Sequence, residues 1–183
     1  IIFGHNRLKI IDVSDKSNQP FQANGCSLIF NGCIYNYKNI KKILKKKYNF
    51  KTEGDTEVLL YSLIEWGEYA LDKIDGMYSF IFQNGDETII SVDEFNEKPL
   101  YYHQNENYII FSSEIGPLIE YEKEKIELNL SNNTLKEFLY LGYLTSDKTV
   151  YKNIKKVLPD KVYTIKNKKL SSKKKNDKNN NLY

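Results

Sequence analysis

The fold class is decided by residues 77–113, which read MYSFIFQNGDETIISVDEFNEKPLYYHQNENYIIFSS. Apolar runs of strand length, MYSFIF, TIISV, PLYYH and YIIFSS, are separated by the polar segments QNGDE, FNEK and QNEN. Asn, Gly and Asp in connections this short favour turns between neighbouring strands. The segment therefore predicts a meander of antiparallel strands.

The residues before the meander predict one further strand and two helices. CSLIF, residues 26–30, reads as a buried strand that ends in a turn at Asn31-Gly32. Residues 35–48 predict an amphipathic helix, because apolar side chains recur on one stripe among lysines. Residues 54–74 predict a longer helix with acidic residues in its first turn.

After the meander, we expect helices at residues 112–121 and 131–141, the second stopped by Gly142. Residues 149–170 read as a loop and a hairpin, and the lysine- and asparagine-rich end of the chain is expected to be disordered. Helices between strands, followed by a run of strands, indicate a layered α+β domain with antiparallel sheets.

Composition limits the classes of partner. The chain has 183 residues, and 27 Lys and Arg against 24 Asp and Glu give a formal net charge of +3, which gives no reason to expect nucleic acid. No apolar run reaches the roughly 18 residues of a membrane-spanning helix. Two cysteines suit a reducing cytosol, so a cytoplasmic protein is expected. The oligomeric state stays open, a homo-oligomer included.

Residues 31–33, Asn-Gly-Cys, have two interpretations each. Asn31 and Gly32 form either a hairpin turn or a pair of donors, amide and N–H, that stabilise an oxyanion. Cys33 is either a nucleophile or a small buried residue, and the second is preferred because the two histidines, His5 and His103, lie far from it in sequence. No spacing of ligands typical of a metal site is present.

Charged residues offer a second set of alternatives. Arg7 is either an ordinary surface arginine or a planar fork for a carboxylate. Asp55 either caps its helix or pairs with a ligand ammonium. Glu53, Glu57 and Glu114 are expected to face solvent.

Several segments carry a resemblance to a known family. They read, in order, GHNRLKIIDVS, QPF, FNGCIYNYKN, TEGDTEVLLYSLIEWG, IDGMYSFIF, DEFNEKPLYY and FSSEIGPL. This series, over about residues 4–118, resembles the glutaminase domain of glutamine-dependent asparagine synthetase, a class II glutamine amidotransferase of the N-terminal-nucleophile hydrolase type. LKEFLYLGYLTSDKTVYKNIKKVLP resembles the segment that joins this domain to the synthetase domain.

The resemblance implies a four-layer αββα sandwich with antiparallel sheets. Its expected divisions are an incomplete amidotransferase domain at 1–125, a linker at 126–165 and a disordered tail at 166–183. An N-terminal cysteine of the family attacks the amide of L-glutamine, and the released ammonia reaches a synthetase domain that uses ATP and magnesium to amidate aspartate. No cofactor is expected in these 183 residues themselves.

Residue by residue, the resemblance assigns Arg7 to the α-carboxylate of glutamine, Asp55 to its α-ammonium, and Asn31 and Gly32 to the oxyanion hole. Cys33 stands where the family has a glutamate that helps to hold the ammonium. The nucleophile is expected before the GHNRL motif and therefore outside this chain, so we expect no glutamine hydrolysis.

A further departure lies in residues 92–96, where the family's RDRFG reads VDEFN, and this puts the local turn in question. The rival hypothesis is a decayed, non-catalytic relative that binds an amino acid or a partner subunit. A third, that the lysine-rich tail binds nucleic acid, is less favoured than a solvated tail.

Overall fold

The computed structural model describes residues 1–123 and 130–176, and its strands form two antiparallel sheets. The larger sheet has the order β1 (Phe21–Ala23), β2 (Cys26–Ile34), β3 (Gly76–Asn84), β4 (Glu87–Val92), β8 (Lys161–Lys166), β9 (Lys169–Lys174). The smaller sheet has the order β6 (Ile109–Ser112), β5 (Tyr101–Gln104), β7 (Ile154–Lys156). The four predicted strands are therefore confirmed as two antiparallel pairs, β3 with β4 and β5 with β6, but they do not form one meander, because β4 pairs with β8 instead of β5.

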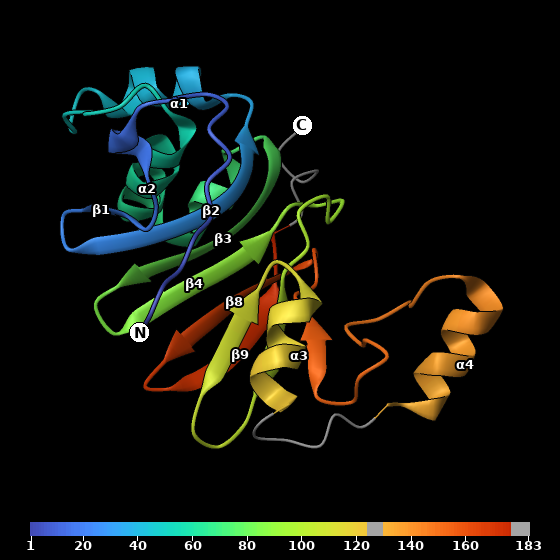
Figure 1. Cartoon of the computed structure of the whole chain (residues 1–183). Coiled ribbons are helices and arrows are strands. Elements are labelled where there is room, and N and C mark those ends of the chain that lie inside the picture. The colour runs from blue at the N-terminus through green and yellow to red at the C-terminus, as the bar shows by residue number, and fades with distance from the viewer. Residues whose placement is uncertain (124–129, 177–183) are drawn as a thin grey trace.

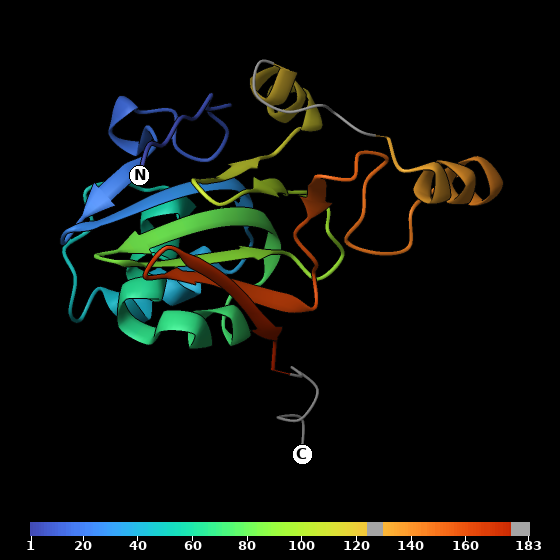
Figure 2. The same cartoon turned by 90° about the horizontal axis from the view of Figure 1, so that it is seen from below.

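The described helices are α1 (Tyr37–Leu44), α2 (Asp55–Trp66), α3 (Ile115–Lys123) and α4 (Asn132–Leu141), with 3₁₀ turns at Asp15–Ser17 and Gly67–Asp72. Three of the four described helices, α1 to α3, cover the outer faces of the sheets (Figures 1 and 2). Helices α1 and α2 lie on one face of the larger sheet, and the smaller sheet lies on the other face with α3 packed against it. This order of layers is the αββα sandwich that the resemblance implied.

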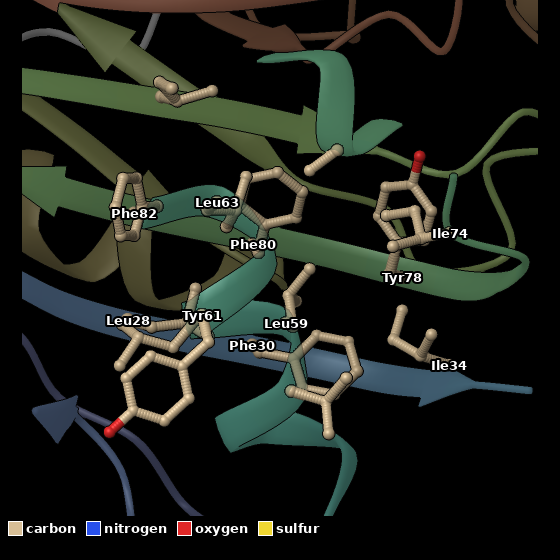
Figure 3. Packing of buried hydrophobic residues seen from close by; sticks show 14 of the residues in the cluster. Leu28, Phe30, Ile34, Leu59, Tyr61, Leu63, Ile74, Tyr78, Phe80 and Phe82 are labelled. Atoms are coloured by element: carbon tan, nitrogen blue, oxygen red, sulfur yellow. The ribbon is translucent and has the colours of Figure 1, made fainter. Parts of the chain in front are cut away.

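Two apolar clusters hold the layers together. Between α2 and the larger sheet, Leu59 and Leu63 pack with Phe30, Phe80 and other buried side chains (Figure 3). Between the two sheets, a second cluster is made by strand residues of both, by the residue before β5 and by the segment before β8: Ile81, Ile90, Val92, Leu100, Tyr102, Val157 and Tyr163. Because β3 is buried on both faces, its sequence is an apolar run rather than an alternating one.

Helix α4 covers neither sheet and stands apart from them in both views (Figures 1 and 2). It begins after Ser131, whose hydroxyl accepts a hydrogen bond from the Thr134 N–H at 3.4 Å. It ends at Gly142, whose φ of 79° is the left-handed conformation that glycine adopts without strain, so this predicted stop is confirmed.

The end of the chain differs from the expectation. Residues 169–174 form β9, which pairs with β8, so the prediction that the chain is disordered from residue 166 is wrong for this strand. Residues 177–183 lie outside the described residues. Strands β7 and β8 fall in the expected linker 126–165, yet each pairs with a strand from residues 1–125. A division at residue 125 therefore does not separate the sheets, and the joining role of 126–165 stays a prediction.

In the part of the chain that the structure describes, no helix combines the length and the apolar character that crossing a membrane requires.

Candidate functional site

Strand β2 does not end at Asn31-Gly32. It continues to Ile34, with Asn31 opposite Ser79 and Gly32 opposite Tyr78, so the hairpin-turn interpretation is wrong. Gly32 has a φ of 148°, and a Cβ there would overlap the Met77 carbonyl oxygen and lie 2.8 Å from the Tyr78 Cα. Only glycine allows this close approach of the two backbones.

The free edge of β2 beyond β1 is covered by side chains. The Gln19 amide bonds both backbone groups of Phe30: its Oε1 accepts from the N–H at 2.6 Å and its Nε2 donates to the carbonyl at 2.9 Å. Further along, the Ile34 N–H donates to Asp55 Oδ2 at 2.9 Å. Backbone groups of alternate residues point to the same edge of a strand. The Gly32 N–H is therefore directed to this edge, between the two covered positions.

Asn31, the residue before Gly32, carries a side-chain amide that is a further hydrogen-bond donor. Its side chain is exposed, and it shares a strand face with Ile29, which packs against the cluster between the sheets. A side-chain amide and a backbone N–H on consecutive residues can together stabilise a negative oxygen, since both are fixed before the charge develops.

Asp55 is the first residue of α2 and is buried, with 5% of its surface exposed. The N-cap position belongs to Gly54, and the Asp55 carboxylate reaches across to β2. Burial raises the pKa of Asp55 above the usual value, although hydrogen bonds from backbone N–H groups and the charge of Arg7 act in the opposite direction. A buried carboxylate of this kind gains from a cationic partner.

Arg7 is half-buried in the segment before β1 and is not a free surface arginine. Its guanidinium donates to the Ser14 carbonyl at 2.9 Å, to Asn18 Oδ1 at 3.4 Å and to the Asp12 carbonyl. Arginine has five N–H donors, and the bonds to described residues use three of them. The others can bind the carboxylate of a ligand. Arg7 and Asp55 thus provide one cation and one anion beside the end of β2.

Cys33 does not have the properties of an activated nucleophile. Burial and the nearby charge of Asp55 raise its pKa, which keeps the group as a neutral thiol. Burial also raises the pKa of Cys26, and both cysteines are free. The preferred interpretation of Cys33 as a small buried residue rather than a nucleophile agrees with this neutral thiol, although the side chain is half-buried and not fully buried.

The altered turn at residues 92–96 is well formed. Asp93 is buried and its carboxylate accepts from the N–H groups of Tyr78, Phe95, Glu97 and Lys98 at 2.9–3.1 Å. Asn96 takes a φ of 56°, a left-handed conformation that Asn tolerates better than most residues and that the family's glycine would adopt freely. The loss of two arginines and a glycine has therefore not removed the turn.

Sequence reasoning misplaced one acid and overlooked another. Glu57 is buried and accepts from the Thr52 N–H at 2.7 Å, the Thr52 hydroxyl at 2.7 Å and the Lys51 N–H at 2.9 Å, so its predicted exposure is wrong. Glu53 and Glu114 are exposed as expected. Asp12 was not singled out, although it lies in the GHNRLKIIDVS segment, and it accepts three hydrogen bonds there.

Among the described residues, no three His, Cys, Asp or Glu side chains gather as ligands of a metal ion would.

Solved structures share this fold. The glutamine phosphoribosylpyrophosphate amidotransferase from B. subtilis, complexed with ADP and GMP, superposes with a TM-score of 0.63 at 21% identity, over 94% of this chain and 34% of that one. A glutamine aminotransferase class-II domain protein from Silicibacter pomeroyi gives a TM-score of 0.53 at 12% identity, over 90% of this chain and 74% of that one. The fold is therefore that of the N-terminal-nucleophile glutamine amidotransferases.

The chain belongs to the glutamine amidotransferase domain family, whose pattern it matches over residues 1–176. It is 32% identical to asparagine synthetase [glutamine-hydrolyzing] 1 of Bacillus subtilis, over 90% of this chain and 26% of that protein. It is 31% identical to putative asparagine synthetase [glutamine-hydrolyzing] 2 of Methanocaldococcus jannaschii, over 82% of this chain and 32% of that protein. The chain thus spans about a quarter to a third of the length of these relatives.

Proposed function

We propose that this chain is the glutamine-binding part of a glutamine-hydrolysing asparagine synthetase. The observation that carries the proposal is the arrangement around β2, where Arg7, Asp55 and the Asn31-Gly32 pair offer a cation, an anion and two amide donors. L-glutamine has the matching groups: an α-carboxylate, an α-ammonium and a side-chain amide. The names of the asparagine synthetases to which the chain is similar support the choice of pathway.

Each residue has a separate task in binding. Arg7 holds the α-carboxylate by charge-assisted hydrogen bonds, and Asp55 holds the α-ammonium. The positive charge of the ammonium offsets the free-energy cost of burying the ionised Asp55 carboxylate. The side-chain carbonyl of glutamine faces the Asn31 amide and the Gly32 N–H. When a nucleophile adds to this carbonyl, the oxygen becomes negative and the two donors stabilise it more strongly than in the ground state.

The 183 residues by themselves bind glutamine without hydrolysing it, according to this proposal. Attack on an amide needs a thiolate or a thiol beside a base, and the environments of Cys26 and Cys33 favour the neutral thiol at both positions. Ammonia release is therefore expected at the background rate. Steady release from the purified 183-residue chain, lost on Cys33→Ser, would show that Cys33 acts as a nucleophile after all.

Calorimetric titration with L-glutamine tests binding. Arg7→Ala and Asp55→Asn should each weaken it about 10- to 150-fold, because each removes a charge-assisted contact of about 1.5–3 kcal/mol. Lys9→Ala is the matched control, since Lys9 is a cation of the same segment that pairs with Asp15 at the surface. A wild-type chain that does not bind glutamine, or variants that bind like the control, would overturn the proposal.

The alternative function is that of a non-catalytic domain that binds an amino acid or a partner subunit. The thiol at Cys33, in place of the family's glutamate, is the observation that favours it. Cys33→Glu in a longer protein that contains the nucleophile distinguishes the two. A return of glutaminase activity indicates recent loss of function in a glutaminase site, and an unchanged background indicates a site put to another use.

We further propose that helix α4, within the expected linker 126–165, faces a synthetase domain, which would use the ATP and magnesium. The exposure of Leu139 and Tyr140 on this helix, 75% and 89%, supports this, because both side chains are large and apolar in character. The cytoplasm remains the proposed compartment, supported by two free cysteines. Light scattering on the purified chain will decide whether it also pairs with itself.

A further inference from the structure

The Asp12 carboxylate joins three separate pieces of backbone and side chain. Its Oδ1 accepts from the Ser14 N–H at 2.8 Å, and its Oδ2 accepts from the Ser17 hydroxyl at 2.8 Å. The same Oδ2 accepts from the Glu53 N–H at 3.0 Å, 41 residues away in the chain. Asp12 therefore connects the segment before β1 to the residues that lead into α2.

At one end of this connection lies the Arg7 guanidinium. It donates to the carbonyl of Asp12 itself and to the Ser14 carbonyl at 2.9 Å. The turn that presents these two carbonyls is closed by the bond from the Ser14 N–H to the Asp12 carboxylate. The carboxylate thus fixes the backbone that orients the arginine.

At the other end lies Asp55, two residues after Glu53. Between them, Gly54 packs so closely that a Cβ would lie 3.3 Å from both the Asp12 Cβ and the Ser17 Oγ. A side chain there would push the two segments apart by a few tenths of an ångström. The hydrogen bonds from Ser14, with those from Ser17 and the Glu53 N–H, hold the pKa of Asp12 far below its usual value, so the carboxylate is ionised at neutral pH.

We propose that Asp12 is a positioning residue that sets the spacing between Arg7 and Asp55, and thereby the selectivity of the site for the L-α-amino acid end of its ligand. The inference rests on the proposed glutamine binding. L- and D-glutamine are distinguished only when three groups on the chiral carbon are held at fixed positions: the carboxylate by Arg7, the ammonium by Asp55, and the side chain by the Asn31-Gly32 pair. The distance between Arg7 and Asp55 is one side of this triangle, so a change in that distance weakens the distinction. Asp12 touches no ligand group in this account and acts through Arg7 and the start of α2.

The test compares Asp12→Asn with Asp15→Asn. Asp15 lies in the same segment, but its carboxylate is exposed and, among the described residues, bonds to Lys9 and Asn18 at the surface. Titration with L- and D-glutamine should show the Asp12 variant binding the L-form at least about tenfold more weakly, with a reduced L-to-D ratio. The Asp15 variant should stay within about twofold of wild type for both.

A double-mutant cycle with Arg7→Ala distinguishes an effect of Asp12 on the position of Arg7 from a general loss of stability of the domain. If Asp12 acts through Arg7, Asp12→Asn costs less than about threefold once the arginine is gone. The same fold-loss in both backgrounds, or an unchanged L-to-D ratio, overturns the proposal.

A second variant and a second measurement keep the test independent of folding and of glutamine itself. Gly54→Ala keeps every charge and pushes the two segments apart, so it should lower the L-to-D ratio in the same direction. Hydrogen exchange of the Glu53 N–H should be faster in the Asp12 variant than in the Asp15 variant, with or without ligand. If wild type binds no glutamine but this exchange differs as expected, the proposed function fails and the bracing by Asp12 stands. If the Glu53 N–H exchanges equally fast in the two variants, the proposed positioning role of Asp12 is wrong.

Discussion

Replacing Gly32 with alanine tests the close approach of β2 and β3 on which the candidate oxyanion site depends. The new Cβ would overlap the Met77 carbonyl oxygen and lie 2.8 Å from the Tyr78 Cα, both of them backbone atoms that cannot rotate away. It would also hold alanine at a φ of 148°. The substitution therefore combines backbone strain with overpacking.

The expected loss of stability in Gly32→Ala follows from these two effects. Strain at a disfavoured φ costs about 1–3 kcal/mol and overpacking about 1–3 kcal/mol, so Gly32→Ala should lower the free energy of unfolding by about 2–6 kcal/mol. For a chain of this length, the Tm should fall by at least about 5 °C. Urea denaturation followed by circular dichroism measures the first quantity, and a thermal scan measures the second.

Two matched glycines complete the experiment. Gly85→Ala places alanine at a φ of 56° with no atom within 4 Å, so it reports the backbone effect alone, about 1–2 kcal/mol. Gly76→Ala should resemble Gly32→Ala, since its Cβ would overlap the Cys33 carbonyl oxygen. If Gly32→Ala is no less stable than Gly85→Ala, the strands do not approach as described and the reasoning is refuted.

Other predictions concern the acids and the thiol around the site. Glu57→Ala leaves buried donors unsatisfied and should cost about 2–4 kcal/mol in urea titrations, whereas Glu53→Ala at the surface should cost at most about 1 kcal/mol; equal losses would contradict the burial of Glu57. Because burial raises the pKa of Asp55, the folded state binds its proton more tightly than the unfolded chain does, so this residue's contribution to stability should increase as the pH falls through the raised pKa. Glutamine affinity should decrease as the pH falls over the same range, starting above the ordinary Asp pKa of about 4. In calorimetry, Asp55→Asn should remove this pH dependence. If the variant keeps the pH profile of the wild type, Asp55 is not the partner of the ammonium. Burial and Asp55 raise the pKa of Cys33, so iodoacetamide should alkylate it more slowly at pH 8 than it alkylates free cysteine, and a faster reaction, followed by mass spectrometry, would argue for an activated thiol.

The sequence predicted those parts of the fold that depend on local patterns. The stop of α4 at Gly142 and the strand runs of β3 and β4 follow from turn residues and hydrophobic runs within a few positions. The Asn31-Gly32 pair was misinterpreted, because the same dipeptide that favours a hairpin turn here lies inside a strand. The reason is the pairing with β3, where Gly32 lies against the backbone of Met77 and Tyr78, about 45 positions further along the sequence.

The resemblance named the candidate site residues but not the residues that support them. Arg7, Asp55 and the Asn31-Gly32 pair were assigned from it, and their roles in binding stay a proposal, whereas the hydrogen bond from the Ile34 N–H to Asp55 was not foreseen. The burial of Glu57 was missed, since it depends on the loop at Lys51 and Thr52 folding back over the first turn of α2. Asp12 was missed because its partner, the Glu53 N–H, is a backbone group that no residue pattern marks.

The order of strands in the larger sheet has a consequence for synthesis on the ribosome. Strands β1 to β4 are joined in sequence order and can pair as soon as they emerge, but the outer edge of β4 pairs with β8, which begins only at Lys161. That edge, with its apolar TIISV segment, must wait for on the order of 70 further residues, or roughly 4–15 s of translation. During that interval the nascent chain presents an unpaired apolar strand edge, so we expect its yield in cells to depend on chaperones that cover such edges.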